Sequence, residues 1–239
     1  MSIPVAELLV SVRSADEAKK AAAAGALVID VKEPDEGSLG RAAVAIWRDV
    51  RRFVPAHIPM SVALGELTEW QVGQGPALPL GAFDGVAYCK LGLAHAGPDW
   101  RDDWRALRDR IPTRRCRWIA VVYADWETAG APSPDEILDL AIATPAIVGV
   151  LVDTFDKSQS ARLDDSGWLP WAQRVRAAHL KLAIAGGLTP ETIKNLAALE
   201  PDLIAVRGAA CEYGDRRGDI DERRVSELAA IVRGLFVPS

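Results

Sequence analysis

Lysine is scarce in this sequence, and three of its lysines stand at the ends of short apolar runs. The chain has seven lysines among 28 basic residues, and Lys32, Lys90 and Lys157 hold those positions. A surface cation is either lysine or arginine, whereas a nucleophilic or Schiff-base amine has to be lysine, because a guanidinium does not deprotonate at usable pH. The pattern therefore predicts amine chemistry.

Aspartates accompany these lysines at the spacing of a strand. Asp30 lies two residues before Lys32, so on a strand both side chains face the same side, and Asp153 ends another apolar run. Clustered, partly desolvated ammonium groups lower each other's pKa from about 10.4 toward neutrality. The aspartates then balance charge or move protons. For any one lysine, a structural ion pair with a neighbouring aspartate is the alternative.

Short apolar runs alternate with longer amphipathic ones along the whole chain. We expect strands at residues 8–12, 27–31, 60–64, 86–90, 118–123, 147–152, 182–185 and 203–206. We expect helices at residues 15–24, 42–53, 100–110, 133–143, 168–178, 190–199 and 222–234. No helix is expected at 69–82, where Gly73, Gly75, Pro76 and Pro79 interrupt the pattern.

Apolar strands separated by helices indicate a parallel sheet that is buried on both faces. Eight such units in 239 residues predict an α/β protein with one domain, a (β/α)8 TIM barrel over residues 1–239. An open doubly wound sheet is the alternative. Barrel active sites lie at the carboxyl ends of the strands, and alternate strands fill the same interior layer. Lys32, Lys90, Asp30 and Asp153, on strands two, four and six, are therefore expected to converge as catalytic residues.

Glycine-rich loops follow the seventh and eighth strands, where barrels commonly bind phosphate. We expect backbone N–H groups there, with one arginine, to bind substrate phosphate; the residues are Gly186, Gly187, Arg207, Gly208 and Ala209. Ser38 and Gly40, in the loop after the second strand, are further candidate phosphate ligands.

Composition excludes several classes of function. The net charge is −5 without a basic cluster, so neither nucleic acid nor a membrane surface is an expected partner. No apolar run reaches the roughly 18 residues of a membrane span. The three cysteines and three histidines lack metal-ligand spacing, so we expect no metal site and a cytoplasmic protein with reduced thiols. The sequence leaves open whether the chain forms a homo-oligomer.

Several short motifs, in order along nearly the whole chain, resemble the (5-formylfuran-3-yl)methyl phosphate synthase family. They are Leu8-Leu9-Val10-Ser11-Val12, Ile29-Asp30-Val31-Lys32-Glu33-Pro34, Gly37-Ser38-Leu39-Gly40, Lys90-Leu91-Gly92-Leu93, Tyr123-Ala124-Asp125, Leu151-Val152-Asp153-Thr154 and Val206-Arg207-Gly208-Ala209-Ala210-Cys211. The family has a further lysine and a glycine where this chain reads Ser158-Gln159-Ser160.

The resemblance implies a barrel lyase that condenses two glyceraldehyde 3-phosphate molecules into a furan aldehyde phosphate, with loss of phosphate and water. That product is a precursor of methanofuran or a related one-carbon carrier. By the same resemblance Lys32 is the Schiff-base residue, Lys90 the proton acceptor, and Asp30 and Lys157 further catalytic residues. Neither a metal nor a redox cofactor is expected, and the partner is a small phosphorylated triose.

Two other functions are compatible with the residues. A phosphate-binding isomerase or epimerase would use the lysines as electrostatic groups and turn over one substrate without a covalent adduct. A non-catalytic metabolite-binding barrel would bind its ligand without turnover. Burial of two ammonium groups argues against the second, because such burial is costly where no chemistry requires it.

Overall fold

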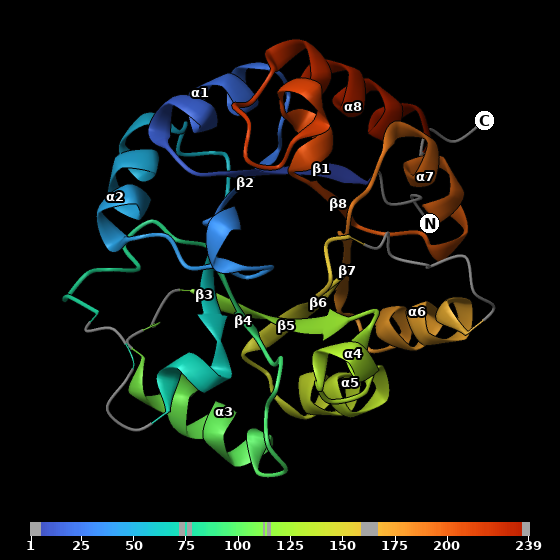
Figure 1. The fold of residues 1–239 in the computed structure, drawn as a ribbon. Coiled ribbons are helices and arrows are strands. Elements are labelled where there is room, and N and C mark those ends of the chain that lie inside the picture. The colour runs from blue at the N-terminus through green and yellow to red at the C-terminus, as the bar shows by residue number, and fades with distance from the viewer. Residues whose placement is uncertain are drawn as a thin grey trace.

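The computed structural model describes residues 6–71, 75, 78–111, 113, 116–158 and 167–235. Its parallel strands close into a barrel in chain order, and β8 pairs with β1 (Figure 1). The strands are β1 (Glu7–Val12), β2 (Val28–Val31), β3 (Met60–Glu66), β4 (Tyr88–Gly92), β5 (Arg117–Tyr123), β6 (Ile147–Asp153), β7 (Lys181–Ile184) and β8 (Leu203–Val206). The predicted (β/α)8 barrel is confirmed.

Helices form a ring around this barrel (Figure 1). They are α1 (Ala15–Ala23), α2 (Val44–Phe53), α3 (Trp100–Arg110), α4 (Trp126–Ala129), α5 (Pro134–Ala143), α6 (Trp168–Ala177), α7 (Pro190–Asn195) and α8 (Glu222–Leu235). Short 3-10 turns add η1 (Pro34–Glu36), η2 (Leu67–Trp70), η3 (Leu196–Leu199), η4 (Gly208–Ala210) and η5 (Glu212–Gly214). None of the described helices is both long enough and apolar enough to cross a bilayer.

The helices begin where the sequence offers capping groups. The Ser14 hydroxyl accepts from the Glu17 N–H at the start of α1. Ser133 and Glu136 form a capping box at α5, and Pro follows the cap of both α5 and α7. These side chains satisfy N–H groups that have no partner inside a helix.

Three segments differ from the sequence expectation. The helix expected at 190–199 divides into α7 and η3, and the single turn of α4 was not expected. Within the segment 69–82 the described residues include the end of η2, while Gly73 and Pro76 lie outside the described residues.

Two apolar layers hold the barrel together. The larger one lies between strands and helices, and a smaller one fills the barrel interior with residues such as Leu9, Val121 and Leu151. Towards β7 and β8 the interior residues are small, including Ala185 and Ala205. Small side chains on this side leave room for a cavity at the carboxyl ends of the strands.

Candidate active site

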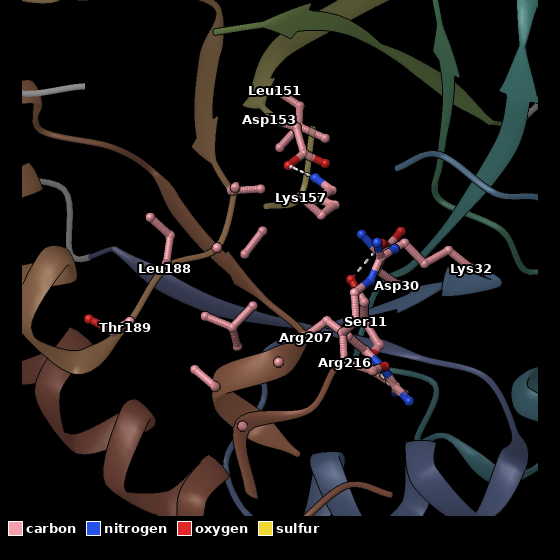
Figure 2. Close-up of a pocket in the computed structure, with 18 of the residues that line it drawn as sticks. Ser11, Asp30, Lys32, Leu151, Asp153, Lys157, Leu188, Thr189, Arg207 and Arg216 are labelled. Carbon is pink, nitrogen blue, oxygen red and sulfur yellow. Dashed lines mark hydrogen bonds and ion pairs between the residues drawn. The ribbon is translucent and has the colours of Figure 1, made fainter. Parts of the chain in front are cut away.

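A cavity of about 460 Å³ opens at the carboxyl ends of the strands (Figure 2). Its lining comes mainly from β1, β2, β4 and β6 and from the loops that follow β7 and β8. Six cationic and three acidic side chains contribute to it, namely Lys32, Lys90, Lys157, Arg207, Arg216, Arg224, Asp30, Asp153 and Asp215. Such an excess of positive charge favours an anionic ligand.

Lys32 directly follows β2 and is 9% exposed. Its ammonium donates to the Ser38 carbonyl at 3.3 Å, and it forms no ion pair with any described carboxylate within 4.0 Å. Its pKa is lowered from 10.5 to about 8: burial is the largest cause, Lys157 and Lys90 act in the same direction, and Asp153 and Asp30 oppose them. A substantial fraction of Lys32 is therefore the neutral amine near neutral pH.

Lys90 and Asp30 form a buried ion pair. The Lys90 Nζ lies 2.7 Å from Asp30 Oδ1, and these side chains are 5% and 1% exposed. Ser11, the β1 partner of Asp30 in the strand register, donates its hydroxyl to Asp30 Oδ2 at 3.0 Å. Both carboxylate oxygens are thereby oriented, one towards β1 and the other towards β4.

Asp153 and Lys157 form a second pair across the cavity (Figure 2). Their Oδ1 and Nζ atoms lie 2.5 Å apart, and the Thr154 N–H also donates to Asp153 Oδ1, at 2.8 Å. Burial raises the pKa of Asp153, but Lys157 and Lys32 outweigh it and hold the pKa below its usual value. Asp153 is thus an anion beside Lys32, and the five predicted catalytic residues all line one cavity.

Ser11→Ala is expected to lower kcat by about tenfold. The variant removes a hydrogen bond to a charged group, which contributes roughly 1.5–3 kcal/mol and holds the Asp30 carboxylate against Lys90. Steady-state kinetics with the Ser11→Thr variant as control tests this, because threonine keeps the hydroxyl. Equal kcat values for the wild type and the alanine variant would contradict it.

The loops after β7 and β8 contribute backbone groups to the same cavity. Gly186 and Gly187 have φ angles of 100° and 64°, a region that glycine adopts without strain. Among the described residues, the backbone N–H groups of Gly186, Gly187, Gly208 and Ala209 have no hydrogen-bond partner. These four predicted phosphate ligands therefore present unused donors to the cavity.

Arg207, predicted to bind phosphate, has protein partners for its guanidinium in the structure. It lines the cavity, but protein acceptors occupy all five of its N–H donors. Glu17 takes two of them as a buried ion pair, and the carbonyls of Ser11, Arg216 and Gly218 take the others. Arg207 has no donor left for a phosphate, and its contacts position β1 and the loop after β8.

Ser38 and Gly40, the other predicted phosphate ligands, are not among the residues that line this cavity. The Ser38 hydroxyl donates to the Thr154 carbonyl at 2.7 Å and lies 3.1 Å from the Phe155 carbonyl, so it fastens its loop to the end of β6. Gly40 allows a close turn, since a Cβ there would lie 2.0 Å from the Glu33 carbonyl oxygen. These residues shape the loop that holds Lys32.

Sequence reasoning did not predict several residues that line the cavity, among them Ser11, Asp215, Arg216 and Arg224. The side-chain alternation used for Asp30 could also have predicted Ser11, because Ser11 is the penultimate residue of β1 as Asp30 is of β2. Arg216 lies just after η5, a turn in which the backbone of Tyr213 has a φ of 55°. No periodicity predicts where a side chain of such a segment points.

Comparison with known proteins decides the family. The family model described as 4-HFC-P synthase matches residues 8–229. The chain belongs to this family. It is 32% identical to the (5-formylfuran-3-yl)methyl phosphate synthase of Methanococcus aeolicus, over 94% of this chain and 98% of that protein. The synthase of that name from Methanopyrus kandleri is 34% identical, over 93% and 97%. The resemblance drawn from the motifs is thus confirmed, and with it membership of a family of synthases, which are enzymes.

Solved structures at lower identity share the fold of this 4-HFC-P synthase family member. A phosphoribosylanthranilate isomerase from Thermotoga maritima is 15% identical with a TM-score of 0.60, over 96% of this chain and 99% of that chain. The 3-hexulose-6-phosphate synthase from Salmonella typhimurium is 14% identical with a TM-score of 0.60, over 94% and 98%. At such identity these structures support the barrel and no particular activity.

The described part of the chain contains no cluster of three or more His, Cys, Asp or Glu side chains suited to a metal ion. Beyond Lys157 the chain departs from the family pattern at Ser158-Gln159-Ser160. Gln159 and Ser160 lie outside the described residues.

Proposed function

We propose that this chain condenses two molecules of glyceraldehyde 3-phosphate into (5-formylfuran-3-yl)methyl phosphate through a Schiff base on Lys32. Relatives of that name support the product. The proposed place of the product is in the synthesis of methanofuran or a similar one-carbon carrier. The protein is proposed to act in the cytoplasm.

The observation that carries the mechanism is the buried Lys32 amine. Its pKa of about 8 makes the neutral form available, and no described carboxylate lies within ion-pair distance of it. A neutral amine attacks an aldehyde, and loss of water from the resulting carbinolamine gives an imine. Two Lys–Asp pairs line the same cavity and are the groups proposed to supply and remove protons.

Lys90 is the proposed proton acceptor for the next step. Lys90 has to be a neutral amine in this step, and its proposed proton partner is Asp30, whose Oδ1 lies 2.7 Å from the Lys90 Nζ. That amine removes a proton from the carbon next to the imine, whose electrons pass to the iminium nitrogen and give an enamine. The enamine carbon is then the nucleophile for the second aldehyde.

The remaining steps form the ring. The enamine carbon attacks the second aldehyde carbon, forming one carbon–carbon bond, and eliminations with ring closure give the furan. Two triose phosphates lose one phosphate and two waters in all, so the atoms balance without an oxidant or a reductant. Asp153 and Lys157, as an ion pair facing Lys32, are the proposed groups that move protons during these eliminations.

The cavity lining supports a phosphorylated substrate. Cationic side chains outnumber acidic ones, and the loops after β7 and β8, which have unused N–H groups, line the same space. Backbone N–H groups and arginines are the donors that bind phosphate in other proteins.

One assay tests the proposal directly. Purified protein is incubated with glyceraldehyde 3-phosphate, and a furan chromophore and free phosphate are expected in equal amounts. Conversion of one sugar phosphate into an isomer, without released phosphate, would support the isomerase instead. Binding of the triose phosphate without any product would support a metabolite-binding protein.

A further inference from the structure

Arg216 presents a largely unused guanidinium to the cavity. Its Nη2 donates to the Gly37 carbonyl at 3.0 Å, and this is its sole side-chain hydrogen bond within the described residues. Four of its five N–H donors therefore remain available. Its side chain lies close to Arg207 and Ser11 on one wall of the site (Figure 2).

The two arginines on this wall differ in what they can bind. Arg207 is 7% exposed, and Glu17 and three carbonyls use every donor that it has. Arg216 has no carboxylate within 4.0 Å among the described residues. A phosphate group can accept two parallel N–H bonds from one planar guanidinium. Arg216 has donors available for such a contact, whereas Arg207 has none.

Two cations of the cavity lining, Lys32 and Arg216, have no carboxylate that neutralises them among the described residues. Asp30 pairs with Lys90, and Asp153 pairs with Lys157. Asp215, the third acid of the lining, accepts the backbone N–H of Arg217 at 2.9 Å. Lys32 and Arg216 are thus lining cations without a carboxylate partner, as expected for a site that receives a phosphate monoester with a charge of about −1.5 to −2.

The backbone beside Arg216 completes this wall. Gly208 packs against the segment that carries Arg216, since a Cβ on Gly208 would lie 3.0 Å from the Gly214 carbonyl oxygen. The unused N–H groups of Gly208 and Ala209 therefore lie on the same wall as Arg216, and Gly186 and Gly187 line the cavity from the neighbouring strand end.

From this arrangement we infer that Arg216, and not Arg207, binds the phosphate of the triose phosphate whose aldehyde reacts with Lys32. The inference rests on the proposed function and adds a specificity-determining residue to it. Arg216 also holds Gly37, and the next residue, Ser38, accepts from Lys32. One side chain thus contacts the substrate phosphate and the loop that orients the nucleophile.

Direct binding of glycerol 3-phosphate tests the inference, because this probe carries the phosphate and has no aldehyde. Calorimetry on Arg216→Ala is expected to show a dissociation constant at least tenfold above that of the wild type. Arg217→Ala is the matched control: Arg217 binds the same loop through Asp35 at 2.7 Å, is exposed, and does not line the cavity. Its dissociation constant is expected to stay within twofold of the wild type.

Arg207→Ala provides the contrasting result. It leaves the buried Glu17 with Arg13 in place of its two bonds to Arg207, so its melting temperature is expected to fall by several degrees, which is not expected for Arg216→Ala. An Arg216→Ala protein that binds glycerol 3-phosphate like the wild type would overturn the inference. Equal loss of affinity in Arg217→Ala would also overturn it, by assigning the effect to the loop. The inference would likewise be overturned if the wild type did not bind glycerol 3-phosphate.

Borohydride trapping separates this inference from the proposed function. Loss of the bond from Arg216 to Gly37 affects both aldehydes alike, so Arg216→Ala is expected to slow the trapping of glyceraldehyde 3-phosphate at least tenfold more than the trapping of unphosphorylated glyceraldehyde. If the wild type binds glycerol 3-phosphate through Arg216 but traps no aldehyde, the phosphate site stands and the Schiff-base function fails. If trapping occurs at Lys32 but is equally fast in Arg216→Ala with the phosphorylated aldehyde, the function stands and the inference fails.

Discussion

Lys32→Met is expected to abolish both turnover and the covalent adduct that borohydride traps between the protein and glyceraldehyde 3-phosphate. Methionine fills a similar volume but has no amine, so no imine can form at this position. In the wild type, mass spectrometry of tryptic peptides is expected to place one triose-phosphate-sized addition on Lys32. Lys90 and Lys157 each contact a carboxylate, whereas Lys32 has a carbonyl as its partner.

The pH dependence of trapping follows from the pKa of Lys32. That pKa is about 8, so the neutral amine increases as pH rises through 8, and the rate of adduct formation is expected to rise with it and then level off. Labelling at Lys90 or Lys157 would assign the nucleophile to that residue. Product formation by the wild type without any trapped adduct would contradict the Schiff-base mechanism.

Lys32→Met is also expected to be at least as stable as the wild type at pH 7. The pKa of Lys32 is lower in the folded chain than its ordinary value of 10.5, so the unfolded chain binds the proton more tightly. Protonated Lys32 therefore lowers the free energy of unfolding below pH 8, and this cost disappears as pH rises towards 10.5. Denaturant unfolding of both proteins at pH 7 and pH 10 measures this difference in the free energy of unfolding. A variant less stable than the wild type at pH 7 would contradict the burial argument.

The fold could be predicted from the sequence because residues close together in the chain determine where its strands and helices lie. The strand Leu203–Val206 and the helix Trp100–Arg110 lie where periodicity placed them. The approach of Lys90 to Asp30 followed from strand order and side-chain parity, which hold for any closed parallel barrel. Each of these inferences used neighbours in sequence or a rule of the whole architecture.

Sequence reasoning could not anticipate two contacts that side chains make with groups remote in sequence. Glu17 resembles an ordinary acid in the first turn of a helix, yet it pairs with Arg207, 190 residues away. Ser38 resembles a free donor, yet it bonds to the carbonyl of Thr154, 116 residues away. A sequence shows which side chains have donors, whereas only the packed structure shows which donors are already used. Because the donors of Arg207 are used, the arginine that we infer to bind phosphate is Arg216.

Lys90→Arg is expected to reduce kcat by about 10²–10⁴-fold, the usual contribution of general acid–base catalysis, although the positive charge beside Asp30 is kept. A proton acceptor has to reach its neutral form, and a guanidinium cannot do so at usable pH. Below Lys90, a cavity of about 60 Å³ lined in part by Ser61 and Tyr88 offers room for the larger head group. The ion pair with Asp30 is therefore expected to persist.

Adduct trapping in the same variant separates the two lysines. Imine formation on Lys32 precedes proton removal, so Lys90→Arg is expected to retain borohydride labelling at Lys32 while turnover is lost. A melting temperature close to that of the wild type is the control for folding. Lys90→Met serves as the second variant, with the same expected loss of turnover but lower stability, because it leaves Asp30 buried without its cation. If Lys90→Arg keeps most of its activity, Lys90 acts through its charge alone, and the proton acceptor has to be sought in the Asp153–Lys157 pair on the opposite side of the cavity.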